Sequence, residues 1–324
     1  MNKRPFRTIS ILILTAVLLS ACLGTGSSVE ERAPLRVGWS LWPGYYPMAL
    51  AAEKGFFEKH GVAVEPVFYG VYTNQTPDLA SGMIDGAVST LSDVLFDSVS
   101  SSVKVVLVLD NSAGADQIVA SAEVANAADL RGKRIGVSPT TVSGELLIRQ
   151  MLEQNGIMPS EVTFVNVPPE NVPGAIPGLI DAGYSFDPFV AEALAKGGKV
   201  VFTSADAPGI IVDVLALRRE IVRDRPEDVS AFIAAWLEAV EYWKQNPADG
   251  NAIIAKATGL KPEEVSFAGV DLFDQKANQL TFIPGSTSIS VYFTAQMGLQ
   301  FLADSGEVTK PVDINQLLDP SFLK

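Results

Sequence analysis

Short apolar segments alternate with helical segments along most of this chain, and this alternation restricts the fold more than any other feature of the sequence. Residues 62–69 and 83–90 have the length and composition of strands, and helical patterns at 47–60 and 76–82 precede them. Residues 103–109 are almost all Val and Leu, as expected of a strand buried on both faces. The sequence therefore predicts an α/β fold with doubly wound parallel sheets.

A second unit repeats the same alternation. Residues 127–138 read as a helical turn that leads into a strand, and residues 145–155 read as the helix that follows. Two further strand patterns lie at 162–167 and 200–203. We therefore expect two lobes, the first formed by residues 35–115 and 214–324 and the second by residues 116–213.

A strongly periodic helix begins at Pro226. Its apolar residues recur every three or four positions and include Trp236 and Trp243. Because these two rings share one helical face, we expect them in the core rather than at a ligand. Helical segments continue to the C-terminus, and we expect them to pack back onto the first lobe.

The N-terminus has the pattern of a bacterial lipoprotein signal. Lys3, Arg4 and Arg7 precede an apolar run at 9–19, and Cys22 follows directly after Ala21. The run is short for a membrane span. We predict a signal peptide over residues 1–21, lipidation of Cys22 and a flexible tether over residues 22–34. Two or three acyl chains on Cys22 would give stable membrane anchoring.

Cysteine and histidine are almost absent from the sequence. Cys22 is the single Cys, and His60 is the single His and lies where a helix ends before Gly61. A cation at that position is typical of helix capping. Hydrolytic triads, Cys chemistry and His-based metal sites are therefore disfavoured, and the sequence predicts no catalytic residue, no metal and no cofactor.

The formal net charge is −13, and it becomes more negative once the basic signal is removed. An acidic surface argues against binding to nucleic acid or to anionic lipid headgroups.

The stretch Leu35 to Pro47 has the form of a ligand-site loop. A short strand is interrupted at Pro43 and Gly44, and a helix begins at Pro47. In an open α/β sheet such a loop faces the binding crevice. Trp39, still inside the strand, is expected nearer the core.

Aromatic, hydroxyl and acidic residues of the predicted crevice loops are the candidate ligand contacts. They are Trp42, Tyr45, Tyr46, Tyr69, Tyr72, Asn74, Thr90, Ser92, Asp93, Thr140, Thr141, Phe186 and Asp187, with Ser143 as a further hydroxyl. Several have an alternative structural role: Ser92 and Thr140 as helix caps, Asp93 as a helix-start charge, and Asn74 and Asp187 as turn residues.

A set of short motifs in a fixed order covers nearly the whole chain after the signal. The motifs are Arg36-Val-Gly-Trp39 with Trp42-Pro-Gly-Tyr45, Leu50-Ala-Ala-Glu-Lys-Gly-Phe-Phe57 with Gly61 and Val64, Gly82-Met-Ile-Asp-Gly-Ala87, Asp129-Leu-Arg-Gly-Lys-Arg-Ile-Gly-Val137, and Asp187-Pro188. On these motifs the chain resembles the solute-binding proteins of ABC importers, in the branch that serves aliphatic sulfonates, taurine, nitrate and thiamine-precursor pyrimidines.

The resemblance implies a two-lobed periplasmic-binding-protein fold of type II, with the ligand cleft between the lobes and crossover segments near 112–121 and 208–217. It implies closure of the lobes on a small molecule and delivery to an ABC permease with its ATPase. We expect a monomer without enzymatic activity, held by Cys22 at the outer face of the cell membrane, which is the periplasmic side in a host with an outer membrane.

The predicted loops contain Asp93 and Asp187 but no Lys or Arg. Rings and carboxylates suit a planar, nitrogen-containing nutrient, such as riboflavin or a pyrimidine vitamin precursor, better than a small anion. The alternative on the same scaffold is an aliphatic sulfonate, taurine or nitrate. A ligand-presenting sensor would differ only in its partner. A pyrimidine-synthesising enzyme would need His and Cys chemistry that this chain lacks.

Overall fold

The structure is a computed structural model that describes residues 32–96, 102–139, 141–306 and 312–324. Residues Pro34–Lys324 form one compact unit. The predicted signal peptide, the lipidation site Cys22, most of the tether and the candidate contact Thr140 lie outside the described residues.

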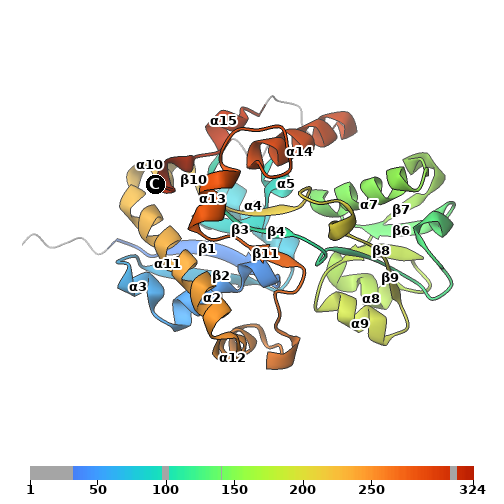
Figure 1. Ribbon diagram of the computed structural model, residues 1–324, viewed down its shortest axis with the longest axis horizontal. Helices are drawn as coiled ribbons and strands as arrows, with labels where there is room; N and C mark the ends of the chain where they lie inside the picture. The colour runs from blue at the N-terminus through green and yellow to red at the C-terminus, as the bar shows by residue number, and fades with distance from the viewer. Residues whose placement is uncertain (1–31, 97–101, 140, 307–311) are drawn as a thin grey trace, which may run out of the picture. The chain divides into compact units, whose positions relative to one another are not determined.

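The first of two sheets has six strands in the order β11-β4-β10-β3-β1-β2 (Figure 1). Its strands are β1 (Leu35–Ser40), β2 (Val64–Tyr69), β3 (Gly86–Thr90), β4 (Val103–Ser112), β10 (Val212–Arg218) and β11 (Val270–Leu272). β2, β1 and β3 are parallel neighbours, whereas β10 is antiparallel to both β3 and β4. β11 pairs antiparallel with β4 at the edge.

The second sheet has five strands in the order β7-β6-β8-β5-β9. Its strands are β5 (Gln117–Ala120), β6 (Arg134–Val137), β7 (Thr163–Asn166), β8 (Ala182–Ser185) and β9 (Lys199–Thr203). β7, β6 and β8 are parallel, and β5 runs antiparallel to β8 and β9. We call each sheet with its helices a lobe, the first sheet belonging to the first lobe.

Both sheets are mixed: β2, β1 and β3 run parallel, as do β7, β6 and β8, and the remaining strands pair antiparallel. The chain passes between the sheets twice, from β4 to β5 through residues 113–116 and from β9 to β10 through residues 204–211. The strand that returns to the first sheet inserts antiparallel between β3 and β4. The predicted second crossover at 208–217 therefore includes most of a strand, because β10 begins at Val212.

The helices cover the faces of the sheets. They are α2 (Pro47–Glu53), α3 (Phe56–Lys59), α4 (Gln75–Ser81), α5 (Leu91–Val94), α7 (Val142–Gln154), α8 (Val172–Ala175), α9 (Phe189–Ala195), α10 (Arg219–Asp224), α11 (Pro226–Gln245), α12 (Pro247–Thr258), α13 (Gln275–Thr281), α14 (Val291–Ser305) and α15 (Ile314–Leu317). The helix expected at 47–60 is divided into α2 and α3, because Gly55 adopts a left-handed φ of 68°.

Helix α11 lies along α2 and α3 in the core of the first lobe (Figure 1). The side chains of Trp236 and Trp243 are fully buried, which confirms the prediction that they belong to the core. The rings of Phe57 and Phe232 lie 5.0 Å apart and join α3 to α11.

The C-terminal helices pack on the first sheet. Asn278 of α13 accepts a hydrogen bond from the Val108 backbone N–H at 2.8 Å and donates to the Val108 carbonyl at 2.9 Å. Leu318 forms a parallel bridge with Val105. These contacts attach the end of the chain to β4.

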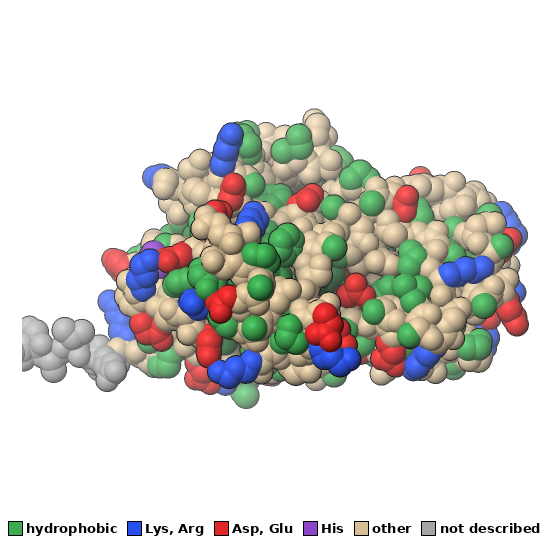
Figure 2. All heavy atoms as spheres, turned by 60° about the horizontal axis from the view of Figure 1, so that its bottom comes forward, with side chains coloured by type: hydrophobic (Ala, Val, Ile, Leu, Met, Phe, Trp, Pro, Cys, Tyr) green, Lys and Arg blue, Asp and Glu red, His purple; other side chains and the backbone are tan. Residues whose placement is uncertain are grey.

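Acidic and basic side chains are interspersed over the face of the molecule in Figure 2 rather than gathered into one patch. Within the described residues, no helix combines the length and the apolar character that crossing a membrane requires.

Candidate ligand-binding site

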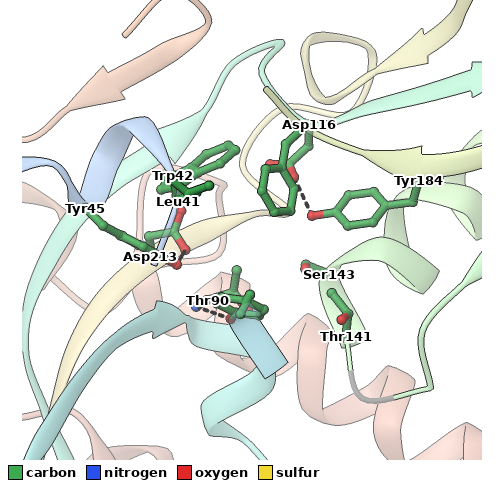
Figure 3. Close-up of a pocket in the computed structure, with 11 residues that line it drawn as sticks. Leu41, Trp42, Tyr45, Thr90, Asp116, Thr141, Ser143, Tyr184 and Asp213 are labelled. Carbon is green, nitrogen blue, oxygen red and sulfur yellow. Dashed lines mark hydrogen bonds between the residues drawn. The ribbon is translucent and has the colours of Figure 1, made fainter. Parts of the chain in front are cut away.

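A cavity of about 290 Å³ lies between the two sheets (Figure 3). It is lined by Leu41, Trp42, Tyr45, Tyr72, Thr90, Asp116, Thr141, Ser143, Tyr184, Phe186 and Asp213. Several of these residues follow or end parallel strands: Trp42 follows β1, Thr90 ends β3 and Phe186 follows β8. The cavity therefore occupies the place where α/β sheets bind ligands, at the carboxyl ends of their strands.

Aromatic rings from both lobes meet at the cavity. The rings of Trp42 and Phe186 lie 5.7 Å apart at 89°, an edge-to-face contact between the first and the second lobe. Tyr45 lies 6.4 Å from Trp42, and Tyr184 lies 6.3 Å from Phe186. The rings form an apolar wall that can contact the body of a small ligand.

Two buried carboxyl groups stand opposite each other on neighbouring strands. Asp110 of β4 pairs with Asp213 of β10 in the sheet register, and both side chains are almost completely buried. Tyr45 Oη donates to Asp213 Oδ1 at 2.6 Å, and Trp42 Nε1 donates to Asp110 Oδ1 at 3.3 Å.

Burial and the neighbouring carboxylate raise the pKa of Asp110 well above its usual range, and burial raises the pKa of Asp213 to about 7. The pair therefore holds a shared proton near neutral pH.

Gly44 allows the aromatic loop to approach this carboxyl pair. A Cβ atom at position 44 would lie 1.7 Å from Asp110 Oδ2 and 2.8 Å from Trp42 Nε1. Only glycine leaves room for the carboxyl group, which explains the Pro43-Gly44 turn in structural terms.

Asp116 is the carboxylate best placed to receive a ligand. It lies in the connection between β4 and β5, Tyr184 Oη donates a hydrogen bond to its Oδ1, and its backbone N–H donates to Ser112 Oγ at 3.1 Å (Figure 3). Burial raises the pKa of Asp116 to about 6. Among the described residues, no group hydrogen-bonds to Asp116 Oδ2 or to Thr141 Oγ1, although both atoms are buried. A ligand with N–H donors would satisfy the free carboxylate oxygen.

Seven of the predicted residues line the cavity, namely Trp42, Tyr45, Tyr72, Thr90, Thr141 and Phe186, with the further hydroxyl Ser143. The two other predicted tyrosines lie elsewhere. Tyr46 packs its buried ring 6.1 Å from Trp243, because it points toward α11. Tyr69, at the end of the edge strand β2, donates its hydroxyl to Asp78 Oδ2 of α4 at 2.6 Å.

The remaining predicted polar contacts that the structure describes do not line the cavity. Asn74 is exposed at the end of a 3-10 turn, and Ser92 Oγ donates to Thr90 Oγ1 at 3.5 Å. Asp187 accepts from the Ala191 N–H at 3.1 Å in the first turn of α9. Asp93 is buried behind the cavity wall, where Tyr72 Oη and the Val142 N–H donate to it.

Four residues that line the cavity were not predicted from the sequence: Leu41, Asp116, Tyr184 and Asp213. Asp213 stands within the apolar run 210–217, and a carboxylate inside a buried strand is itself a signal of a functional site. Asp116 lies within the first predicted crossover and outside the predicted crevice loops. Within the described residues, no cluster of His, Cys, Asp and Glu is arranged to hold a metal ion.

The fold and the cavity define a class of protein: a two-lobed α/β protein that binds a small solute between its lobes. The chain matches the family described as NMT1/THI5 like over residues 42–250. It is 30% identical over 268 residues to a binding protein of Brucella abortus, an alignment that covers 79% of each chain. The chain belongs to the NMT1/THI5-like family.

Two further comparisons concern named binding proteins. The chain is 28% identical over 233 residues to the taurine-binding periplasmic protein of Escherichia coli K12, covering 68% of this chain and 64% of the relative. The structure superposes on the periplasmic aliphatic sulphonate binding protein SsuA of Escherichia coli with a TM-score of 0.71 at 18% identity, covering 88% of this chain and 92% of SsuA. The structural match shows the two-lobed periplasmic-binding-protein fold.

Proposed function

We propose that this protein is the extracytoplasmic solute-binding component of an ABC importer, anchored through Cys22, and that it captures a small solute that bears an amine. The observation that carries the proposal is the buried Asp116 carboxylate, held by Tyr184 with one oxygen free, in a cavity walled by aromatic rings from both lobes. Closure of the lobes around the solute would present a defined surface to the permease.

The size of the cavity restricts the solute. Its empty space of about 290 Å³, which includes space open to solvent, is smaller than the roughly 300 to 1,000 Å³ typical of ligand pockets. A molecule with one ring or a short chain fits this space, whereas a flavin with three fused rings and a ribityl chain exceeds it. The proposal therefore does not include riboflavin.

The charge of the cavity restricts the solute further. Asp116 and Asp213 line it, and its lining within the described part of the chain contains no Lys, Arg or His. A solute that carries only negative charge, such as nitrate or a simple alkanesulfonate, would meet carboxylates without a balancing cation. A protonated amine would form a charge-assisted hydrogen bond with Asp116 and could lie against the ring faces.

The names of the relatives favour the sulfonate, taurine and nitrate group over the heterocycles. Taurine fits both the charge of the cavity and the names of the relatives, because it carries an amine as well as a sulfonate. Its amine would face Asp116, and its sulfonate would face the hydroxyls of Thr90, Thr141 and Ser143, which line the same cavity. A single-ring aminopyrimidine is the second candidate, because the rings of Trp42 and Phe186 provide a wall for stacking.

A matched panel of solutes tests the proposal. Isothermal titration calorimetry would compare taurine, ethanesulfonate, an aminopyrimidine, nitrate and riboflavin. Ethanesulfonate is taurine without its amine, so this pair isolates the predicted contribution of the carboxylate. We expect taurine or the aminopyrimidine to bind at least about tenfold more tightly than ethanesulfonate. Measurable binding of taurine and ethanesulfonate with equal affinity, or binding of ethanesulfonate as tight as that of the aminopyrimidine, would refute the amine requirement.

The proposal assigns no catalytic step to the chain. The same titrations, followed by mass spectrometry of the recovered solute, distinguish binding from turnover: the solute should be recovered unchanged. Capture of an ABC permease, rather than a sensor kinase, by the solute-loaded protein would support transport over signalling.

Trp42 provides a prediction for the aromatic wall. Trp42→Ala removes the edge-to-face contact with Phe186 and should weaken binding of the panel's tightest solute roughly 10- to 100-fold. Trp39→Phe is the matched control, because Trp39 packs against Phe68 at 4.9 Å and does not line the cavity. If circular dichroism shows unchanged helical content and the affinity of Trp42→Ala is also unchanged, Trp42 does not contact the solute.

A further inference from the structure

Asp93 makes contacts with both lobes from behind the cavity wall. Its Oδ2 accepts a hydrogen bond from Tyr72 Oη at 2.7 Å within the first lobe. Its Oδ1 accepts from the backbone N–H of Val142 at 2.7 Å, at the first residue of α7 in the second lobe. Both oxygens are thus occupied by protein donors, and the side chain is 1% exposed.

The two partners of Asp93 stand directly beside the solute cavity. Tyr72 lines the cavity from the first lobe, and Thr141, next to Val142, lines it from the second. Tyr72 Oη also accepts from the Thr90 backbone N–H at 3.0 Å, so the same hydroxyl fixes the end of β3. The Asp93 carboxyl group therefore joins the two cavity walls through one side chain.

Physical chemistry favours a carboxylate at this position. The first N–H groups of a helix have no partner within the helix, and a negative charge there interacts favourably with the helix dipole. α7 is 13 residues long, so this effect is fully developed. Two charge-assisted hydrogen bonds offset part of the cost of burying the charge.

A second contact spans the cleft at the same place. The Tyr72 backbone N–H donates to Glu170 Oε1 at 3.3 Å, and Glu170 belongs to a 3-10 turn of the second lobe at Pro169–Asn171. Tyr72 thus contacts the second lobe through its own backbone and, through Asp93, by its side chain. These bonds exist only when the lobes are apposed.

We propose that Asp93 is a positioning residue that holds the closed arrangement of the lobes by joining Tyr72 to the first turn of α7, and so sets the places of Tyr72 and Thr141 at the cavity. This inference replaces the role of direct ligand contact expected from the sequence. It rests on the proposed function only in taking the cavity as the solute site.

Hydrogen exchange of the protein without added solute provides the test. Mass spectrometry of peptides that cover the start of α7 would be compared with peptides from α5, β3 and α11 in the parent, Asp93→Asn and Asp93→Ala. Ser92→Ala is the matched control, because Ser92 is a buried neighbour on the same short helix that contacts Thr90 and does not line the cavity.

We expect exchange at the start of α7 to become at least about tenfold faster in Asp93→Ala, with α5, β3 and α11 unchanged. Asp93→Asn keeps an oxygen that can accept from Val142 and should restore part of the protection. Faster exchange confined to α5 and β3 would show a role within the first lobe only and would overturn the proposal, as would unchanged exchange in α7. If Asp93→Ala loses protection throughout, the isosteric Asp93→Asn decides. Exchange faster than in the parent at α7 but not at α5 would support the proposal, and parent-like exchange at α7 would overturn it.

The exchange measurement is made without solute, so its result does not depend on which solute of the panel binds. A negative result with taurine would overturn the proposed solute while leaving the exchange result intact. Conversely, normal taurine binding combined with unchanged exchange at α7 would overturn the role of Asp93 alone.

Discussion

Replacing Asp116 by Asn is expected to lower the affinity for taurine, or for the aminopyrimidine if that is the solute bound, by at least about 100-fold. The substitution keeps the shape of the side chain and removes its charge. Asp116 is buried, the Tyr184 hydroxyl donates to its carboxylate, and Ser112 Oγ accepts from its backbone N–H. A protonated amine transferred from water into this cavity would lose its counter-charge, and water cannot screen the loss there.

The measurement is calorimetric titration at pH 7.5, where Asp116 is ionised because its pKa of about 6 lies below this pH. Asp187→Asn is the control, because Asp187 lies in the second lobe, caps α9 through the Ala191 N–H and does not line the cavity. The control should bind within about twofold of the parent. Tyr184→Phe should weaken binding less than Asp116→Asn, since it removes only the group that orients the carboxylate. Parent-like affinity in Asp116→Asn would place the amine elsewhere.

Local patterns in the sequence predicted the individual elements of the fold well. The Val-rich run at 103–109 lies in the buried strand β4, and the apolar spacing after Pro226 predicted the burial of Trp236 and Trp243. The direction of β10 could not be predicted, because it depends on how the chain returns from the second sheet to the first. Strand pairing over long sequence distances leaves little trace in a single sequence.

For the site as well, a local rule identified some of the residues that line the cavity and missed others. The loops after β1 and β8 were predicted to bear the ligand, because the rule about the carboxyl ends of parallel strands applies directly to them. Trp42, Tyr45 and Phe186 lie at the cavity, whereas the neighbouring Tyr46 points to Trp243 because consecutive residues of the turn face opposite directions.

The acidic residues of the site depend on tertiary structure. Asp110 and Asp213 become neighbours only when β10 pairs with β4, and Asp116 reaches the cavity only through the path of the first crossover. Each of these residues in isolation reads as part of a strand or a loop. Buried carboxylates in apolar runs are therefore the sequence signal to examine first in chains of this kind.

The paired carboxyl groups of Asp110 and Asp213 should make the solute-free protein less stable as the pH rises. The pKa of Asp213 is about 7 in the folded state, against 3.8 for an exposed Asp, and the pKa of Asp110 is also raised. Between these pH values the folded state holds protons that the unfolded state has released. With respect to these groups, stability is therefore highest below about pH 4 and falls as the pH rises from 4 to 7.

Asp213→Asn should remove much of this pH dependence and should stabilise the solute-free protein at pH 8 by roughly 2 to 4 kcal/mol, because it removes the buried negative charge that Asp213 carries above pH 7. The measurement is chemical denaturation at several pH values between 5 and 8. The variant should keep a smaller dependence of stability on pH, because the pKa values of Asp116 and Asp93 are also raised, to about 6.

The same substitution should weaken binding of an amine-bearing solute, because Asp213 lines the cavity. A gain in stability together with a loss of affinity is expected where a binding site keeps charges buried for its ligand rather than for its fold. Asp85→Asn is a control of equal chemistry, since Asp85 lies at the first sheet outside the cavity and accepts a hydrogen bond from the Arg36 backbone N–H at 2.9 Å. It should not gain stability at pH 8. A loss of stability in Asp213→Asn at pH 8 would mean that its hydrogen bond with Tyr45 outweighs the cost of burying its charge, and that the carboxyl pair serves the fold.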